Sequence, residues 1–451
     1  MKAVAQVAAA RRTAFHILLA VERGHGHADD LLRARAADAL SAVDRKLATA
    51  LVLGALRWQI RLDYQLHKLL KRPGAKLETE VRVALRLGAL QILHMDRIPA
   101  RAAIDESVEL AKQAGHRFAS GMVNAVLRRL ANEPREEFPE RTAAELALAT
   151  AHPAWMVERW ARSFGLGAAR AICQHGQSQP AAAVRLDAPE VEAELTGQGV
   201  MLEPGVLLAA ARRVTAGDVT ASAAFAAGRA RLQDEGSQLV AEIAGRGEAI
   251  LDCCAAPGGK TLILAERNPG ARIVACEASR ARLAALRERL ALPGGRVECR
   301  LAAAEALDEE AAYDLALVDA PCSGTGTLGR NPEIRHRLKM EDLGRQAERQ
   351  GAILRAALRA VRPGGRVVYA TCSLEPEENE AVVAAALAEM TGVRTIPMPA
   401  RIEALLGESL LTAAGAERLM NGVGPEGWLR LMPDGTGGDG FFMAQLERGR
   451  E

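Results

Sequence analysis

From about residue 229 to the C-terminus, the sequence alternates between short apolar runs and amphipathic stretches. The runs "EAILD", "ARIVACE", "YDLALVD" and "RVVYATCS" have the pattern of buried strands, and helical patterns lie between them. Such alternation predicts a mostly parallel sheet with helices on both faces. Ligands of these sheets bind beyond the carboxyl ends of the strands, where the strand order reverses. We therefore predict an α/β, Rossmann-like domain over residues 229–451.

The first 135 residues have a different pattern, with apolar residues at three- and four-residue spacing throughout, as in "RTAFHILLAVERG". This periodicity predicts an all-α bundle. Between the two regions, "AAAVRLDA" has the pattern of a strand in a small α+β unit. Because 451 residues exceed one ordinary core, we predict three domains: a helical bundle (1–135), an α+β connector (136–228) and the α/β domain (229–451).

Charge is distributed unevenly along the chain. Residues 1–130 contain 22 Lys and Arg against 12 Asp and Glu, out of 58 and 56 in the whole chain, which leaves 36 and 44 for the rest. The helical region therefore carries +10 and the remainder −8. This asymmetry favours a polyanion such as RNA as the partner of the helical region. Solvated basic helix faces would give the same count, and that alternative stays open.

The seven cysteines form no C-x-x-C pair, which argues against a disulfide framework or a zinc site. No stretch has the length and apolarity of a membrane span, and "MKAVAQVAAARR" has the wrong order for a secretory signal. We expect a cytoplasmic protein, monomeric, without a metal.

The motif "LDCCAAPGGKT" follows the first strand of the α/β region. Its small residues allow a ligand to approach the backbone closely. The spacing is neither G-x-G-x-x-G nor that of a phosphate loop, which argues against a critical pyrophosphate. Glu277 ends the next strand, 25 residues after Asp252, where this architecture usually holds a ribose diol. These features predict an adenosyl ligand, with S-adenosylmethionine as the leading candidate.

Two cysteines follow strand-like runs at similar places, Cys322 in "DAPCSGTG" and Cys372 in "YATCS". Methylation of a cytosine at C5 needs a thiolate that adds to C6, an acidic residue at N3 and an acceptor for the C5 proton. Asp319, Cys322 and Cys372 supply these residue types. A single strand-end cysteine is more often structural, and two in these contexts favour chemistry.

The helical region resembles the NusB-type RNA-binding domain. The pieces that carry this resemblance are "DRKLATALVLGALR", "LRLGALQILHMDRIPARAAIDESVELAK" and "GMVNAVLRR". By analogy, six basic residues are candidates for phosphate contacts: Arg11, Arg12, Arg45, Lys46, Arg128 and Arg129.

The motifs "LDCCAAPGGKT", "DAPCSGTGTLGRNPEIRHR" and "YATCSLEPEENE" resemble those of the RNA cytosine-C5 methyltransferases of the Sun/NOL/NSUN family. Together with the NusB-like region, they resemble the Sun/Fmu (RsmB) type of this family, which acts on 16S ribosomal RNA. The resemblance implies Cys372 as the nucleophile, Cys322 in product release and Asp319 at cytosine N3. It implies a cofactor site for S-adenosylmethionine formed by Cys254, Ala255, Ala256, Pro257, Gly258, Gly259, Lys260, Glu277, Arg282 and Asp319.

Two departures from the family pattern affect the cofactor site. Glu277 stands where the family usually has Asp, and the usual Asp after the third strand is missing, with Glu305 as a substitute slightly downstream. Three alternatives stay open: the same chemistry on transfer RNA or large-subunit RNA, a non-catalytic RNA-binding assembly factor, and exchanged roles of the two cysteines.

Overall fold

The computed structural model describes residues 7–33, 40–72, 76–291, 297–433 and 438–450. The chain forms two compact units, one of residues up to 179 together with 328–337, and one of residues 180–327 and 338 onward. The division after residue 179 falls inside the stretch predicted as a connector. The domain boundaries at 135 and 228 stay predictions.

The first unit is all-α, as predicted. Its helices begin where local signals favour them: the Ser41 hydroxyl caps α4 by accepting the Asp44 N–H at 3.1 Å, and Thr142 and Glu145 form a capping box on α8. The helices are α1 (Ala9–Glu22), α2 (Ala28–Arg33), α4 (Ala42–Leu69), α5 (Thr79–His94), α6 (Ala100–Gln113), α7 (Ser120–Asn132), α8 (Ala143–Ala149), α9 (Ala154–Gln177) and α15 (Ile334–Arg337).

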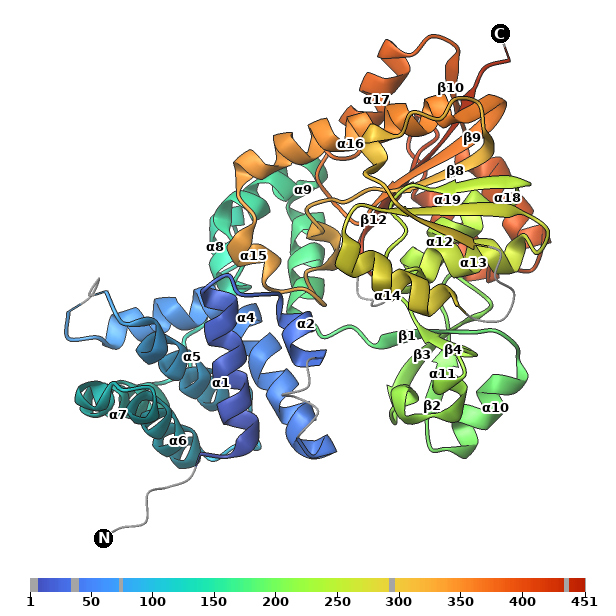
Figure 1. Ribbon diagram of the computed structural model, residues 1–451. Coiled ribbons are helices and arrows are strands. Elements are labelled where there is room, and N and C mark those ends of the chain that lie inside the picture. The colour runs from blue at the N-terminus through green and yellow to red at the C-terminus, as the bar shows by residue number, and fades with distance from the viewer. Residues whose placement is uncertain (1–6, 34–39, 73–75, 292–296, 434–437, 451) are drawn as a thin grey trace. The chain divides into compact units, whose positions relative to one another are not determined.

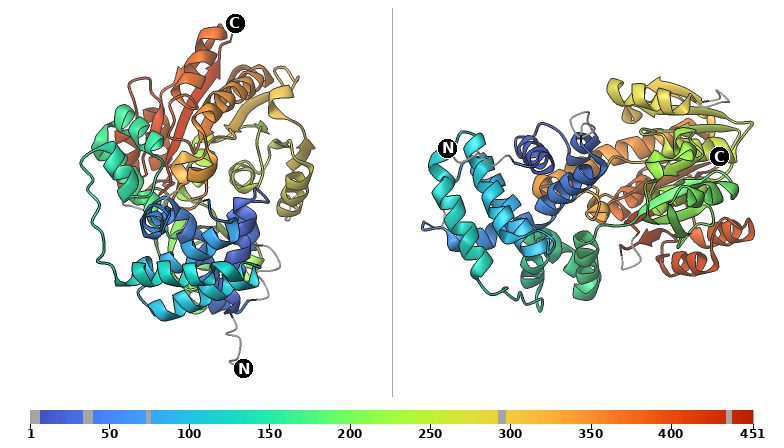
Figure 2. Two further views of the ribbon diagram at one scale, coloured as in Figure 1. Left: turned by 90° about the vertical axis from the view of Figure 1, so that its left-hand side faces the viewer. Right: turned by 90° about the horizontal axis from the view of Figure 1, so that it is seen from below.

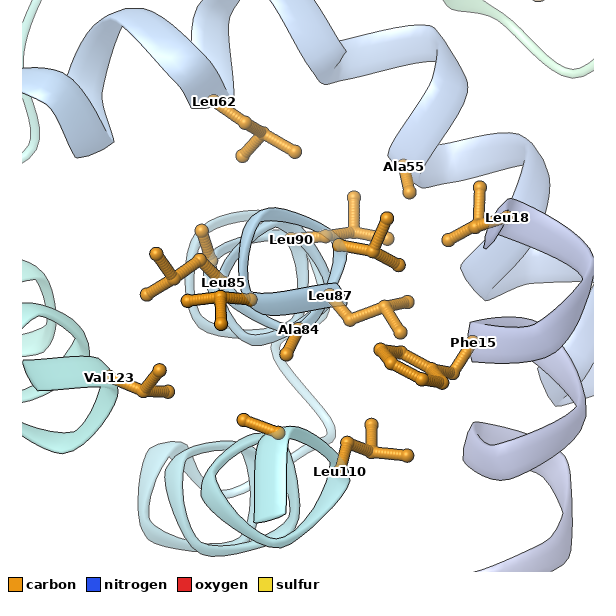
Figure 3. Close-up of a cluster of buried hydrophobic side chains, with 14 of the residues drawn as sticks. Phe15, Leu18, Ala55, Leu62, Ala84, Leu85, Leu87, Leu90, Leu110 and Val123 are labelled. Carbon is orange, nitrogen blue, oxygen red and sulfur yellow. The ribbon is translucent and has the colours of Figure 1, made fainter. Parts of the chain in front are cut away.

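Helix α5 is the centre of this bundle. It is apolar on several sides, with Ala84, Leu85, Leu87 and Leu90 all buried. Figure 3 shows these side chains directed toward the surrounding helices, where they meet residues such as Phe15. A helix that is apolar all round must be covered on all sides. The helices α1, α4, α6 and α7 supply this cover.

The segment 328–337, far along the chain, folds with these helices. Glu333 accepts the Ala28 N–H at 2.9 Å, and the Arg57 guanidinium donates to the Gly329 carbonyl at 2.8 Å. The buried guanidinium of Arg335 donates to the carbonyls of Arg57 at 2.9 Å and Ala151 at 3.3 Å, and to that of Gly176. In Figures 1 and 2 the orange turn of α15 lies against the blue helices of this unit. Sequence periodicity gave no sign of this placement.

The second unit begins with a small α+β part. Its four-stranded antiparallel sheet has the order β2-β3-β1-β4 and packs against two helices. The elements are β1 (Ala182–Leu186), α10 (Glu190–Gly197), β2 (Met201–Pro204), β3 (Ala211–Ala216), α11 (Ala223–Ala226) and β4 (Ala230–Leu232).

The main sheet of this unit has the order β10-β12-β9-β8-β5-β6-β7, with β11 paired to β12. The pairs among β5 to β9 are parallel, and β12 is antiparallel to its neighbours. The predicted mostly parallel sheet is thereby confirmed. The strands are β5 (Ala249–Asp252), β6 (Arg272–Glu277), β7 (Val297–Leu301), β8 (Tyr313–Asp319), β9 (Val361–Thr371), β10 (Val393–Ile396), β11 (Leu429–Leu431) and β12 (Phe441–Arg448).

Helices cover both faces of this sheet (Figure 1). Alternate residues of each strand point to opposite sides, so that Leu251 and Ala316 pack with α16 on one face. Ile250 and Leu315 pack with α12 on the other face. The helices are α12 (Glu235–Ala244), α13 (Gly259–Arg267), α14 (Arg280–Leu290), α16 (Met340–Ala360), α17 (Glu380–Glu389), α18 (Met398–Gly407) and α19 (Ala413–Asn421).

Candidate active site

The strand order of the main sheet reverses between β5 and β8. The chain runs outward from β5 through β6 and β7, and returns to place β8 on the other side of β5. Asp252 ends β5 and Asp319 ends β8. Both therefore lie at the switch point, where this architecture binds its ligands.

The loop after β5 turns tightly into α13. The Gly258 N–H donates to the Ala255 carbonyl at 2.7 Å, and Gly258 has φ of 101°, a conformation that favours glycine. A Cβ on Gly259 would lie 2.9 Å from Gln233 Oε1. The backbone conformation explains why the predicted cofactor loop has glycine at position 258, and the Gln233 side chain packs closely against Gly259.

A cavity of about 80 Å³ opens at this loop. Asp252 Oδ1 and Gln233 Oε1 lie in its lining, are buried, and accept no hydrogen bond within the described part of the chain. Two unpartnered acceptors suit a ligand that carries N–H donors. The lining residues are Leu232, Gln233, Ser237, Asp252, Cys254, Ala255, Ala256, Pro257, Gly259, Lys260, Arg289 and Asp319.

Asp252 is almost completely buried at the base of this cavity. Its Oδ2 accepts a hydrogen bond from the Thr261 hydroxyl at 2.7 Å. Burial raises the pKa of Asp252 to about 6, although the Thr261 hydrogen bond opposes this shift. The Asp319 carboxylate adds to the increase. At neutral pH the carboxyl group is therefore mostly ionised and can pair with a cation that enters the cavity.

Lys260 and Asp319 form an ion pair across the switch point, with Lys260 Nζ 2.6 Å from Asp319 Oδ2. Burial lowers the pKa of Lys260, but the Asp319 carboxylate outweighs this effect, and the pKa ends above its ordinary value. The Lys260 ammonium also interacts electrostatically with Cys372. The Lys260–Asp319 ion pair therefore interacts with one of the two candidate thiols.

The Cys322 and Cys372 thiols lie 3.4 Å apart, Sγ to Sγ. Cys322 follows β8 and Cys372 follows β9, and these strands are parallel neighbours, which explains how residues 50 positions apart meet. The hydrogen bond to Cys372, burial and the Glu378 carboxylate raise the pKa of Cys322 well above its ordinary value. Cys322 is therefore held as a neutral thiol that can donate to Cys372.

The predicted ribose-binding residue, Glu277, is buried at the end of β6. Its Oε1 accepts the Ser279 N–H at 2.8 Å, and its Oε2 lies 3.6 Å from Arg282 Nη1. The Arg282 guanidinium also donates to the Ala256 carbonyl at 2.8 Å, which ties this side chain to the cofactor loop. Glu305 pairs instead with Arg349 at 3.1 Å, so its carboxylate already has a cation.

The six predicted phosphate contacts differ in exposure. Arg11 is buried in the bundle, where it pairs with Glu106 at 3.0 Å and donates to Gln91. A phosphate would have to displace these partners, and we do not retain Arg11 as a candidate. The other five side chains are exposed: Arg12, Arg45, Lys46, Arg128 and Arg129.

Sequence reasoning did not single out Asp252 as a pocket residue or Glu378 beside Cys322. Asp252 stands at the strand end next to the glycine loop, which was a usable signal. Glu378 lies in "EPEENE", where Glu375 and Glu378 are buried and Glu377 and Glu380 are half-buried, and no local pattern distinguishes the buried acids from the others.

Two family models match the chain. The model of 16S rRNA methyltransferase RsmB/F matches residues 243–447, and that of the NusB family matches residues 8–132. The chain is 32% identical to the probable ribosomal RNA small subunit methyltransferase B of Bacillus subtilis (strain 168), over 97% of this chain and 98% of that protein. The chain belongs to the RsmB/F family of 16S rRNA methyltransferases. The ribosomal RNA small subunit methyltransferase B of Pseudomonas putida is 33% identical, with the same coverage.

Solved structures show the same fold as this RsmB/F family member. The crystal structure of PH0851 covers 97% of this chain and 98% of its own, with a TM-score of 0.78 and 23% identity. The structure of NSun6 from Pyrococcus horikoshii with SFG covers 65% of this chain and 97% of its own, with a TM-score of 0.54 and 19% identity. The predicted fold class and family are confirmed.

Within the described residues, no group of three or more His, Cys, Asp and Glu side chains is arranged to hold a metal ion. No described helix combines the length and apolarity needed to cross a membrane.

Proposed function

We propose that this protein transfers the methyl group of S-adenosylmethionine to C5 of a cytosine in 16S ribosomal RNA, through a covalent bond between Cys372 and C6. The observation that carries the proposal is the pair of thiols 3.4 Å apart, one directly after β8 and one directly after β9, together with the Lys260–Asp319 ion pair. Family membership supports the methyltransferase activity and the RNA substrate.

The cavity at the switch point fits the methionine part of S-adenosylmethionine. Its ammonium group would meet the unpartnered acceptors Asp252 Oδ1 and Gln233 Oε1. Glu277 would hold the ribose hydroxyls, and Arg282 would brace the loop through Ala256. The bound cofactor supplies an electrophilic methyl group.

Electrostatics assign different roles to the two cysteines. The hydrogen bond to Cys372 and burial raise the pKa of Cys322 well above its ordinary value, and the Glu378 carboxylate adds to this increase. Cys322 is therefore the better proton carrier, which leaves Cys372 as the nucleophile. This supports the assignment over the exchanged one.

The proposed reaction begins when the Cys372 thiolate bonds to C6 of the cytosine. Electron density moves to N3, which takes up a proton that Asp319 relays from the Lys260 ammonium, and C5 becomes the nucleophile that accepts the methyl group. N3 returns this proton when the bond between N3 and C4 is double again. A base then removes the C5 proton, the double bond between C5 and C6 forms again, and the pair of the S–C6 bond returns to Cys372. Cys322 assists this release, as the base or as a proton donor to the departing sulfur.

The helical unit would hold the RNA through its exposed basic side chains. Contacts of this kind are strong at low salt and weakly sequence-specific. A cytosine in a duplex would have to be flipped out, which favours unpaired or partly assembled RNA.

The test is a methyl-transfer assay with labelled S-adenosylmethionine on RNA fractions that lack the modification, with the target cytosine located by bisulfite sequencing. We expect label in small-subunit RNA. Label in transfer RNA or large-subunit RNA instead would change the substrate, and no label in any RNA would favour a non-catalytic assembly factor.

The covalent step has its own test, gel analysis of protein–RNA adducts. We expect Cys322→Ala to accumulate an adduct and Cys372→Ala to form none. The reverse pattern would exchange the two roles. Cys299→Ala, a half-buried cysteine on β7, is the control.

A further inference from the structure

Each of the two thiols is followed by a buried serine. Ser323 comes after Cys322 and Ser373 after Cys372, and their hydroxyl oxygens lie 3.1 Å apart. The two loops are therefore joined one residue beyond the thiols. The two serines take part in none of the proposed bond-making steps. Their position, directly after the two thiols, suggests that they hold the two loops together.

One carboxylate holds both serines. Glu378 is fully buried, and its Oε2 accepts hydrogen bonds from the hydroxyls of Ser323 and Ser373. Its Oε1 accepts the Ser323 N–H at 2.8 Å and the Gln350 side-chain N–H at 3.0 Å. Four donors thus converge on one carboxylate, which satisfies a buried charge by hydrogen bonds alone.

Neighbouring residues make this arrangement rigid. The Gln350 amide also donates to the carbonyl of Pro321 at 2.9 Å, directly before Cys322. The Tyr369 hydroxyl, on β9, donates to the Glu378 carbonyl at 2.6 Å. The Cys322 loop is therefore held on both sides of the thiol, and Glu378 itself is anchored to the strand that leads to Cys372.

We propose that Glu378 is a positioning residue, which holds the Cys322 and Cys372 thiols at their working separation by binding Ser323 and Ser373 at once. This inference rests on the proposed division of labour between the two cysteines. Reacting groups must be held within a fraction of an ångström, because a misplacement of about 1 Å can cost ~100-fold in rate. Glu378 touches no reacting atom in this role and acts through the loops.

The separation of the thiols can be measured without RNA. In glutathione buffers, the two thiols reduce one oxidised glutathione to two reduced molecules and form a Cys322–Cys372 disulfide, which peptide mass spectrometry identifies. The equilibrium constant gives the effective concentration of one thiol at the other. We expect Glu378→Ala to lower it at least ~10-fold, because the loops are no longer joined.

The matching catalytic measurement is single-turnover methyl transfer. We expect Glu378→Ala to lower the rate about 100-fold while the affinity for S-adenosylmethionine stays unchanged. Glu378→Gln should rescue most of both effects, because the amide oxygen can accept from Ser323 N–H and Gln350 while its N–H groups meet the serine hydroxyls. Glu389→Gln, which removes an exposed carboxylate on α17, is the control.

Glu378→Gln also distinguishes a positioning role of Glu378 from a purely structural role. It removes the negative charge that faces Cys322, so the pH profile of turnover should move to lower pH even where the rate is rescued. If Glu378→Ala does not fold, Ser323→Ala and Ser373→Ala each remove one of the two serine hydroxyls that bind Glu378. Each substitution should lower the effective concentration of one thiol at the other.

The outcomes distinguish this inference from the proposed function. An unchanged effective concentration and rate in Glu378→Ala would overturn the positioning role. A reduced effective concentration in a protein that methylates no RNA would leave that role standing and overturn the proposed function.

Discussion

The ammonium of Lys260 lies 2.6 Å from a carboxylate oxygen of Asp319, where the strand order of the main sheet reverses. The two groups come from different crossover units, the helix after β5 and the end of β8. Pairing keeps a carboxyl group at a fixed place in a partly buried site. Asp319 is thereby oriented before any substrate arrives.

This orientation predicts the effect of Asp319→Asn. The amide keeps the volume but loses the charge-assisted hydrogen bonds, and we expect the rate of methyl transfer to fall ~100-fold or more. Binding of S-adenosylmethionine, measured by calorimetry, should fall less than the rate, although Asp319 also lines the cofactor cavity. Asp308→Asn, an exposed carboxylate in the loop before β8, should leave both values unchanged. Equal losses in rate and in cofactor affinity would contradict a role at the cytosine.

The raised pKa of Asp252 leads us to expect that the free energy of unfolding depends on pH in the absence of ligand. Its pKa is raised from 3.8 to about 6 by burial, so the folded protein retains a proton that the unfolded chain releases between these values. Stability therefore falls as the pH rises from about 4 to 6, and the cost above pH 6 is about 3 kcal/mol. Asp252→Asn should lack this loss.

Urea unfolding of wild type and Asp252→Asn at pH 4.5 and 7.5 measures this difference. We expect the free energy of unfolding of the variant to increase relative to that of the wild type at the higher pH. The Asp308→Asn control should keep the wild-type pH dependence. A constant difference between wild type and variant at both pH values would show that Asp252 does not titrate in this range.

Arg335 predicts a stability effect in the helical unit. Its buried guanidinium donates to the carbonyls of Arg57, Ala151 and Gly176, and Arg335→Ala would remove this donor from all three. We expect a loss of about 3 kcal/mol. Hydrogen exchange should increase around these three residues, whereas Lys339→Ala, at an exposed site, should have no effect. Unchanged protection would mean that the segment does not stabilise the bundle.

Arg128 and Arg129 predict the salt dependence of RNA binding. Both are exposed near the C-terminal end of α7. If each contacts one phosphate, the double substitution to Gln should reduce the slope of log K against log salt by about 1.4 to 1.8. The loss should be similar for unrelated RNA sequences, and cofactor affinity should stay the same. Arg394→Gln, an exposed cation in the second unit, is the control, and an equal loss in it would contradict a specific role of α7.

The sequence predicts the parts of this molecule that depend on local pattern. The strand–helix alternation and the glycine loop indicate the sheet and its switch point, and the motifs place Cys322 and Cys372 directly after two strands. The contact between their thiols depends on strand order, which a sequence pattern does not specify. The burial of Arg11 was missed because an arginine on an amphipathic helix has the same periodicity whether it faces solvent or Glu106.

Glu378 and Arg335 could not be predicted for a related reason. Both are charged residues in charged segments, and each is buried because distant residues supply its hydrogen-bond partners. Removal of residues 1–135 would also leave the segment 328–337 without α2 and α4, two of the helices that it contacts. Point substitutions are therefore the better test of the helical unit.

The placement of residues 328–337 also affects the order of events during synthesis. The helical unit comes first from the ribosome, but its last ten residues follow only after 148 residues of the other unit, 180–327. At ordinary elongation rates this interval is about 7 to 30 s. Until then, the carbonyls of Arg57, Ala151 and Gly176 lack their hydrogen bonds from the Arg335 guanidinium. The N-terminal unit is thus completed only after the ribosome has made the small sheet and strands β5 to β8 of the main sheet.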